Sequence, residues 1–478
     1  MEWATRAEII AACATEPERV ADALLASRRE VQELSERVRE LERQLHQNSG
    51  NSHKPPSSDG YGKPAPKSLR DKSSNASGGQ PGHPGHHLQM VEAPDQVVHH
   101  RPASCRRCGR TLADVASVDS ERRQVCDLVA HMEVTEHQAH RVHCPDCGEV
   151  NAAAFPDGVT QPTQYGSNIK SFVTYCNVGQ FIPSDRLQEL IYDLTGHNLS
   201  EGTLYNVNNT LYERLAPYEE QVKSQLIAAP VAHFDETGLR VDGKLHWLHS
   251  CGTARMTHYT VHRRRGKEGM DAAGVLPSFT GVAVHDGLPA YRKFLCEHGL
   301  CNVHHRRELV AVIENVQQPW AKDMSNLLLE INATKGQAIA LGKDHLDAEC
   351  LDEFAQRYDA IIQQGLRDNP LPTPSVPPKR GRVRKTKTRN LLERLDRYRE
   401  DVLRFAYDFR VPFSNNQAER DVRMVKVQQK VSGAFRTLNG AKTFCRIRGY
   451  ISTLRKHGLS VMSYLRDAFE GHPFIPQS

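Results

Sequence analysis

The sequence has no long apolar run and no targeting signal. No window of the 478 residues approaches the about 18 consecutive apolar side chains that a membrane-spanning helix needs. The N-terminus also lacks the basic and then apolar order of a secretory signal, and an acid, Glu2, follows the first residue. We therefore expect a cytoplasmic chain without a membrane partner, long enough for about three domains with substantial apolar cores.

Cysteine is sparse outside two short motifs. The chain has 12 cysteines, and this usage indicates a reducing compartment rather than a disulfide framework. Two Cys-x-x-Cys motifs, each followed by glycine, place Cys105 with Cys108 and Cys144 with Cys147. Two such turns complete the closed four-thiolate shell of a structural zinc site. The sequence predicts a zinc-binding domain over residues 99–160, with a strand pair around residues 125–142.

Acidic residues are missing from one stretch, residues 379–389. The formal net charge of +5 is modest, so the positive charge is unevenly distributed. Basic runs of this kind contact a polyanion or are disordered. The candidate polyanion-binding residues in this run are Lys379, Arg380, Arg382, Arg384 and Lys385.

The first regular pattern that is present is a heptad repeat within residues 1–47. Its apolar positions are Leu24, Val31, Leu34, Val38, Leu41 and Leu45, separated mostly by Glu, Arg and Gln. The spacing predicts a helix that pairs with a second copy as a short coiled coil. The alternative is one amphipathic helix that packs on its own domain. Residues 48–98 are rich in Asn, Ser, Gly, Pro and Lys, and we interpret them as a disordered linker.

A helix-turn-helix pattern lies within residues 161–225. Ser184 and Ser200 cap two predicted helices that are separated by a glycine-containing turn. On the exposed face of the second helix, Thr203 and Asn206 suit hydrogen bonding in a DNA groove. Helix pairs are common, however, and this face lacks arginine, so base reading and a purely structural role both stay open.

The next region alternates short apolar runs with turns. We expect strands at residues 231–241, 244–251, 256–263, 281–285 and 299–303, and a helix at residues 268–275. Three antiparallel strands followed by alternating helix and strand is the order of the ribonuclease-H-like fold, in which the first and fourth strands are neighbours. The predicted fold class is multidomain α+β, with an α/β core of this type over residues 226–310 and 411–460.

Three acids stand out in this core. Asp235 and Asp286 each end an apolar run, and neighbouring strands would place them together at one edge of the sheet. Glu419 begins a basic helix far downstream. Two carboxylates held so close favour a shared metal, because both cannot ionise easily without one. Oxygen ligands suit divalent ions, and a pair of metals assists in-line displacement at phosphorus. These acids therefore predict a phosphodiester-cleaving site.

The helix that carries Glu419 has two different faces. One face carries Glu419, Arg423, Lys426 and Lys430 at helical spacing. The other carries Ala418, Val422 and Val425, which are suited to packing on a sheet. The cations could neutralise phosphates; the alternative is an exposed helix held by salt bridges.

The interval between the second and third acids is too long for a bare loop. Helical patterning at residues 320–341 and 351–365 predicts a helical insertion over residues 311–410, which ends with a proline-rich stretch and the basic run. The last residues, 461–478, are interpreted as a C-terminal tail.

Together these motifs resemble bacterial DDE transposases of the IS66 insertion-sequence family, and the resemblance covers most of the chain. It rests on the heptad helix, the two Cys-x-x-Cys motifs, Asp235-Glu236-Thr237, His285-Asp286-Gly287, Cys301 with His304, Arg306-Arg307, and residues 415–420. The resemblance implies that Asp235, Asp286 and Glu419 hold two Mg²⁺ ions. It also implies DNA contact by Arg306, Arg307 and Arg420. Glu236 is expected to point to the other face of its strand. His285 and His304 could move protons or contact phosphate, or be structural.

The activity that this resemblance implies has two steps. Water cleaves the DNA at the ends of the element and frees a 3′-hydroxyl, which then attacks target DNA. The implied partners are element-end and target DNA in the nucleoid, a second copy of the chain, and accessory transposition proteins. The sequence leaves two alternatives open: a nuclease of the same fold without strand transfer, and a non-catalytic, zinc-containing DNA-binding regulator.

Overall fold

The computed structural model describes residues 5–45, 47, 51, 88–128, 130–371 and 385–477 of a mixed α+β protein. The chain divides into two compact units, which are considered separately below. One comprises Lys67–Phe155 and Asp193–His197, and the other comprises the remaining residues. Within the described residues, no helix is both long and apolar enough to cross a membrane. Four candidate polyanion-binding residues of the predicted basic run lie outside the described residues: Lys379, Arg380, Arg382 and Arg384.

Two helices form the N-terminal segment, α1 (Arg6–Thr15) and α2 (Pro17–Leu45). α2 begins with a proline, which suits the first turn of a helix because its missing N–H would have no partner there. The predicted long helix is therefore confirmed, whereas α1 was not predicted. The six apolar side chains of the heptad repeat are each more than half exposed. The described residues of the chain leave these side chains exposed, as pairing with a second copy requires. The pairing itself stays a prediction.

The unit containing the cysteine motifs has little regular structure. Its strands are β1 (Arg141–His143) and β2 (Val150–Ala152), which pair antiparallel. The strand pair predicted around residues 125–142 is wrong, because the described residues from 125 to 140 form no strand. The apolar side chains of Val125, Leu128 and Val134 are each more than 80% exposed. A two-stranded ribbon is marginal without a packed apolar face, and these side chains have none.

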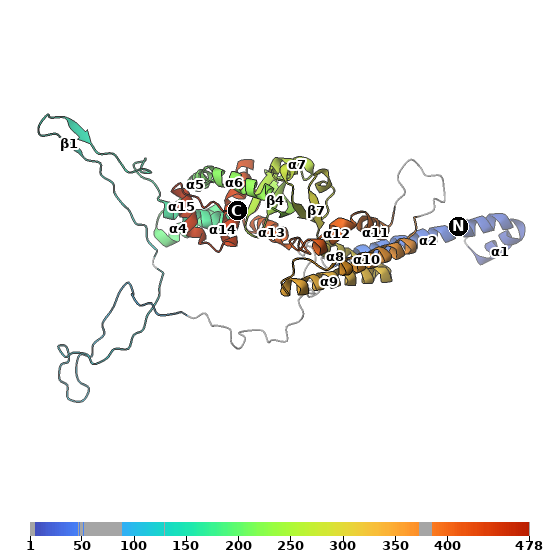
Figure 1. Ribbon diagram of the computed structural model, residues 1–478, viewed down its shortest axis with the longest axis horizontal. Helices are drawn as coiled ribbons and strands as arrows, with labels where there is room; N and C mark the ends of the chain where they lie inside the picture. Colours follow the sequence, from blue (N-terminus) through green and yellow to red (C-terminus); the bar gives the residue numbers. More distant parts are fainter. Residues whose placement is uncertain are drawn as a thin grey trace. The chain divides into compact units, whose positions relative to one another are not determined.

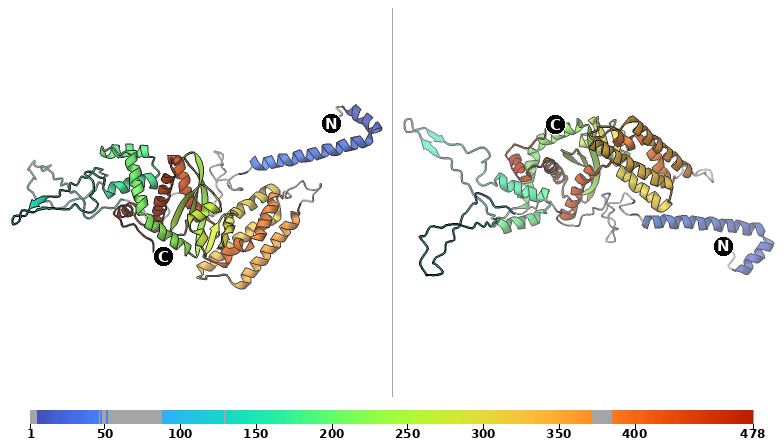
Figure 2. Two further views of the ribbon diagram at one scale, coloured as in Figure 1. Left: turned by 90° about the horizontal axis from the view of Figure 1, so that it is seen from above. Right: turned by 60° about the horizontal axis from the view of Figure 1, so that its bottom comes forward.

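A five-stranded mixed sheet lies at the centre of the larger unit (Figures 1 and 2). Its strands are β3 (Val231–Val241), β4 (Lys244–Gly252), β5 (Thr257–His262), β6 (Val282–His285) and β7 (Glu297–Leu300). Their spatial order is β5-β4-β3-β6-β7. β4 runs antiparallel to β3 and β5, whereas β6 is parallel to β3 and to β7. The predicted neighbourhood of the first and fourth strands is therefore confirmed.

The connections explain why most strand bounds were predictable. Asp242 and Gly243 join β3 to β4 with φ values of 50° and 67°, the left-handed pair that a tight hairpin turn requires. The predicted helix after the third strand is α7 (Lys267–Ala273), which Gly274 ends at a φ of 76°. The fifth strand was placed too late. β7 ends at Leu300, and Cys301 caps the next helix, so residues 302 and 303 are helical rather than extended.

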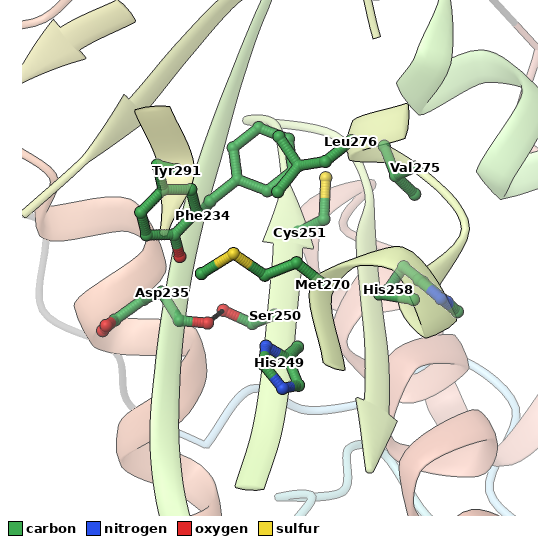
Figure 3. Close-up of a pocket in the computed structure, with 11 residues that line it drawn as sticks. Phe234, Asp235, His249, Ser250, Cys251, His258, Met270, Val275, Leu276 and Tyr291 are labelled. Carbon is green, nitrogen blue, oxygen red and sulfur yellow. Dashed lines mark hydrogen bonds between the residues drawn. The ribbon is translucent and has the colours of Figure 1, made fainter. Parts of the chain in front are cut away.

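Helices cover both faces of the sheet. α13 (Asn416–Ser432) and α14 (Leu438–Lys456) pack on one face, where the hydroxyl of Tyr259 on β5 donates to the carbonyl of Asp421 on α13. Successive strand residues point to opposite faces. His258, the residue before Tyr259, accordingly borders an apolar pocket beneath α7 on the other face (Figure 3).

The larger unit has two apolar cores. One lies around the sheet and includes helices before and after it: α3 (Ser167–Thr174), α4 (Ser184–Thr195), α5 (Glu201–Arg214), α6 (Ala216–Ile227) and α15 (Val461–Phe469). Both helices of the predicted helix-turn-helix pattern are present, and Ser200 caps the second. The C-terminal residues do not form a plain tail, because α15 buries Leu465 and Ala468.

The second core lies between strands β6 and β7 and the helices between β7 and α13. These are α8 (Asn302–Val316), α9 (Pro319–Ala340), α10 (Ala348–Asp368), α11 (Lys387–Arg397) and α12 (Arg399–Tyr407). The helices expected at residues 320–341 and 351–365 are confirmed as α9 and α10. Lys335 of α9 donates to the carbonyls of Phe405 and Val411, and its burial lowers its pKa to about 8. This buried ammonium group ties α9 to the chain segment that leads into α13.

Candidate active site

The strand register places the first two acids side by side. In the parallel pair β3–β6, His233 is the partner of Val284. Asp235 lies two residues after His233 on β3, and Asp286 lies two residues after Val284. Asp286 immediately follows the last residue of β6. Paired strands lie about 4.8 Å apart, so this register brings the two carboxylate-bearing residues to one edge of the sheet. Gly287 follows with a φ of 91°, which lets the chain turn away at once.

The electrostatics of Asp235 show that the three acids share one region. Burial raises the pKa of Asp235 well above its ordinary value, and the charges of Glu236, Asp286 and Glu419 raise it further. Its carboxylate accepts a hydrogen bond from the backbone N–H of Glu236 at 2.8 Å, which acts in the opposite direction. Asp286 and Glu419 therefore lie within electrostatic reach of Asp235, although the three acids lie on separate elements.

Asn415 connects the helix of Glu419 to the strand of Asp235. Its side-chain amide donates to the carbonyl of Phe234 at 2.8 Å, and its amide oxygen lies 2.9 Å from Nδ1 of His233. Its backbone N–H donates to Sγ of Cys301 at 3.2 Å. Asn415 is 1% exposed and immediately precedes α13. The residue was part of a sequence motif, but its role as a junction was not predicted.

A second cluster lies at the start of α8. One ligand atom from each of Cys301, His304 and Glu419 lies within 4.8 Å of the others. Nδ1 of His304 is 4.0 Å from Oε1 of Glu419, and this oxygen is buried without a hydrogen-bond partner. Burial raises the pKa of the Cys301 thiol to about 11. No other described group of three or more His, Cys, Asp or Glu residues is this compact.

The three predicted acids are therefore not arranged around one point. Their ligand oxygens do not all lie within 4.8 Å of one another in the described structure. Two metal ions in such a site are about 3.5–4 Å apart, so ligands at its two ends need not touch. The arrangement is suited to a site that extends along the sheet edge rather than to a single coordination sphere.

Glu236 has a different environment on the other face of β3, as expected. Its buried carboxylate accepts two hydrogen bonds from Arg265, at 2.7 and 2.9 Å, and one from the hydroxyl of Tyr291 at 2.8 Å. Burial and the charge of Asp286 raise its pKa, and the Tyr291 and Arg265 contacts oppose the rise. Figure 3 shows the carboxylate of Asp235 pointing away from the pocket that Tyr291 and Met270 line.

His285 is buried beside this network. Its ring stacks on Tyr291 with the centroids 4.3 Å apart, and its Nε2 lies 3.0 Å from Nδ1 of His298. Burial lowers the pKa of His285 well below its ordinary value, and the charges of His298 and Arg292 add to this effect. These contacts support the structural alternative for His285.

The predicted cationic face of α13 is exposed. The exposed residues are Arg420, Arg423, Lys426 and Lys430, whereas Ala418, Val422 and Val425 are buried. Lys426 also donates its ammonium group to the carbonyl of Gly238 on β3. The alternation of faces is thus confirmed, and DNA contact by the cations stays a prediction.

The other predicted DNA-binding residues lie on separate elements. Arg306 on α8 is half-buried and donates to the hydroxyl of Ser325 at 3.3 Å, and Arg307 beside it is also half-buried. Lys385 binds both carboxylate oxygens of Glu393. On α5, Asn206 is exposed, whereas Thr203 takes part in the cap at Ser200.

Each cysteine motif forms a separate turn. Cys105 and Cys144 each accept a backbone hydrogen bond, from Gly109 and Gly148 respectively, at 2.9 Å. Backbone N–H groups in each turn lower the pKa of Cys105 and Cys144. Within each motif the two thiols are hydrogen-bonded neighbours, but the four cysteines are not gathered around one point in the described structure. The turns suit thiolate ligands, and the complete zinc shell stays a prediction.

The sheet and its acids define an α+β protein in which Asp235 lies within β3 and Asp286 directly follows the neighbouring parallel strand β6. Comparison with known families gives a more particular result. The model of the Transposase IS66 family matches residues 162–443, which include Asp235, Asp286 and Glu419, and the chain belongs to this family. Membership implies an enzyme of DNA transposition. Residues 10–89 match a family of unknown function (DUF6444). No curated protein matches the chain.

Proposed function

We propose that this transposase cleaves DNA at the ends of an insertion sequence and joins them to target DNA, in a reaction that depends on Mg²⁺. The observation that supports the proposal is the raised pKa of the buried Asp235, to which the charges of Asp286 and Glu419 contribute. The strand order, with three antiparallel strands followed by two strands parallel to the first, supports a ribonuclease-H-like core.

The residues at this edge of the sheet fit Mg²⁺. Carboxylate oxygens are the hard ligands that this ion prefers, and like charges close together are stabilised by a cation. The buried Oε1 of Glu419, which has no hydrogen-bond partner, is a free acceptor for an ion. Asp235, Asp286 and Glu419 would therefore hold the metal. Bound there, Mg²⁺ would lower the pKa of an attacking water or 3′-hydroxyl and neutralise charge on the scissile phosphate.

The chain itself contributes position and charge rather than covalent chemistry. Asp235 lies on β3 and Asp286 directly follows β6, so the sheet fixes the backbone beside both acids, and Asn415 fixes the start of the helix that carries the third. Arg420 and Arg423 would neutralise DNA phosphates beside these acids. Because these arginines lie on the same helix as Glu419, a phosphate bound by them would be held close to the acids. Such positioning is a main contribution of a protein to phosphoryl transfer.

Other parts of the chain would organise the DNA complex in the bacterial nucleoid. We assign a structural zinc ion to Cys105, Cys108, Cys144 and Cys147, because their turns favour thiolates. Asn206 and Thr203 would contact a DNA groove, and the exposed heptad face of α2 would pair with a second copy. Arg306, Arg307 and Lys385 would add phosphate contacts, and accessory transposition proteins complete the assembly.

The test uses the purified full-length chain and labelled DNA that carries the ends of its element. Cleaved and joined products are measured with Mg²⁺ for the wild type, Asp235→Ala and Glu419→Gln. Loss of an essential charge-stabilising ligand should reduce both products by about 100-fold or more. Asp323→Ala is a matched control, because Asp323 is an exposed acid on α9.

The products also separate the alternatives. Cleavage without joining would identify a nuclease, and specific DNA binding without either product would identify a regulator. Joining at the wild-type rate by Asp235→Ala would remove the proposed site.

A further inference from the structure

The cluster of Cys301, His304 and Glu419 has a donor set unlike that of the neighbouring acids. Cys301 immediately precedes α8, His304 lies in its first turn, and Glu419 lies in the first turn of α13. The two helix starts therefore bring a sulfur, a nitrogen and an oxygen ligand atom within 4.8 Å of one another. In this respect the cluster differs from the pair of aspartates, which offers oxygen alone.

These donors suit a borderline divalent cation. Sulfur and imidazole nitrogen are ligands of Zn²⁺, whereas Mg²⁺ requires oxygen. Around tetrahedral zinc, neighbouring ligand atoms lie about 3.3–3.8 Å apart, given bond lengths of about 2.0–2.3 Å. The 4.0 Å separation between His304 and Glu419 is close to this range, and the outer limit of 4.8 Å exceeds it by about 1 Å. Small side-chain rotations would close the shell and leave one position open.

The surroundings of the cluster also support an ion. The backbone N–H of Asn415 donates to Sγ of Cys301, and hydrogen bonds of this kind orient a metal ligand and tune its basicity. The side chains of His304 and Glu419 are 15% and 26% exposed, so solvent reaches the cluster from one side. The buried Oε1 of Glu419 lies 4.0 Å from Nδ1 of His304, beyond hydrogen-bond distance, and has no hydrogen-bond partner.

We propose that Cys301, His304 and Glu419 form a Zn²⁺ site that shares Glu419 with the Mg²⁺ site. The shared residue rests on the proposed function, whereas the zinc site itself rests on the cluster alone. Binding forms Zn–S, Zn–N and Zn–O bonds, and the thiol of Cys301 releases its proton to solvent. An ion held there draws the Glu419 carboxylate toward Cys301 and away from Asp235 and Asp286. Zinc is then a competitor of Mg²⁺ at this edge of the sheet.

The first experiment counts zinc ions bound by the full-length chain at equilibrium, without DNA. The wild type should bind one ion more than Cys301→Ser, His304→Gln or Glu419→Gln. Cys350→Ser is the matched control, because Cys350 is a partly exposed cysteine on α10 and should leave the count unchanged. The ions held by the two Cys-x-x-Cys motifs cancel, since every variant retains those motifs. Equal counts in the wild type and the folded His304→Gln variant would overturn the site.

The second experiment tests the shared carboxylate, again without DNA. Zn²⁺ affinity at this site should fall about 10-fold when Mg²⁺ is present at about ten times its own dissociation constant. An affinity that does not change with saturating Mg²⁺ would refute the sharing of Glu419.

The two proposals can fail separately. A missing zinc ion together with normal Mg²⁺-dependent DNA joining overturns the zinc site alone. A bound zinc ion in a chain that neither cleaves nor joins DNA overturns the proposed function alone.

Discussion

Two neighbouring acids on β3 have opposite surroundings. Glu236 is buried between Arg265 and Tyr291, which together donate three hydrogen bonds to its carboxylate. Asp235, the residue before it, instead lies near two further acids, Asp286 and Glu419, which raise its pKa. A buried acid that is paired with a cationic side chain helps to hold the fold together. The ionised form of an acid that is surrounded by other acids is instead stabilised when a metal cation binds from solvent. On a single strand, the comparison separates an acid with structural partners from the acid that we propose as a metal ligand.

The largest expected difference is in stability between two isosteric variants. Glu236→Gln replaces one acceptor oxygen of the Arg265 and Tyr291 hydrogen bonds by an amide donor and should lower the free energy of unfolding by about 1–3 kcal/mol. The loss should lie toward the lower end, because burial raises the pKa of Glu236 and Arg265 is 42% exposed. Asp235→Asn removes a charge that its neighbours repel and should leave stability unchanged or slightly higher. Midpoints of thermal unfolding, measured in divalent-free buffer, provide the comparison.

The same two variants should have the opposite order in activity. Asp235→Asn should lose DNA joining at every Mg²⁺ concentration, whereas Glu236→Gln should retain it below its unfolding temperature. If Asp235→Asn were the less stable of the two, the distinction between the acids would be wrong.

Asn415 offers a way to disturb the acid site without removing an acid. Asn415→Ala leaves the carbonyl of Phe234 without its buried donor, which should cost about 1–3 kcal/mol of stability. Because Glu419 is then less well placed, we expect joining to fall by about 10-fold and the Mg²⁺ concentration for half-maximal rate to rise. A purely structural role would lower stability without changing that Mg²⁺ concentration.

Asn416→Ala is the matched control, since the neighbouring asparagine is exposed at the first residue of α13. It should leave both the stability and the Mg²⁺ dependence close to those of the wild type. Equal effects of the two substitutions would show that Asn415 has no particular role in placing Glu419.

The contrast between Asp235 and Asn415 also shows how far the sequence could predict this site. The hairpin of β3 and β4 depends on local signals, namely alternating side chains and the Asp242-Gly243 turn, and the position of Asp235 followed from them. The junction at Asn415 joins residues 181 and 114 positions apart in the chain, and no local pattern reports such contacts. The late placement of the fifth strand has a related cause. Glu297 and His298 are polar and lie outside the predicted strand, but they belong to β7 because they pair with Val282 and Ala283 of β6, a contact that only the fold reveals.

The pH dependence of stability should also report the raised pKa of Asp235. The folded protein raises the pKa of Asp235, so it keeps this proton to a higher pH than the unfolded chain, in which aspartate titrates near about 4. The free energy of unfolding contributed by this group therefore falls as pH rises from about 4 toward the raised value. The Asp235→Asn variant has no carboxyl group at this position and does not lose this free energy. The difference between its unfolding midpoint and that of the wild type should therefore grow as pH rises across that interval.

Mg²⁺ provides the control for this effect. A bound cation stabilises the ionised carboxylate, so the advantage of Asp235→Asn at neutral pH should shrink or reverse when saturating Mg²⁺ is added. A constant difference between the two proteins at all pH values would mean that Asp235 does not titrate abnormally.

The smallest expected effect concerns the cations rather than the acids, and it extends the same comparison. Arg265 is engaged by Glu236, whereas Arg423 is exposed on the face of α13 that also bears Arg420. Release of condensed counterions makes DNA affinity depend on salt, with a slope of about 0.9 per neutralised phosphate. Arg423→Ala should therefore reduce that slope by about one and weaken binding similarly for all DNA sequences. Arg265→Ala should leave the slope unchanged, because its guanidinium already has a carboxylate partner. Titrations of labelled DNA at several salt concentrations measure both slopes, and a loss of slope in Arg265→Ala alone would place the DNA on the face of the sheet opposite α13.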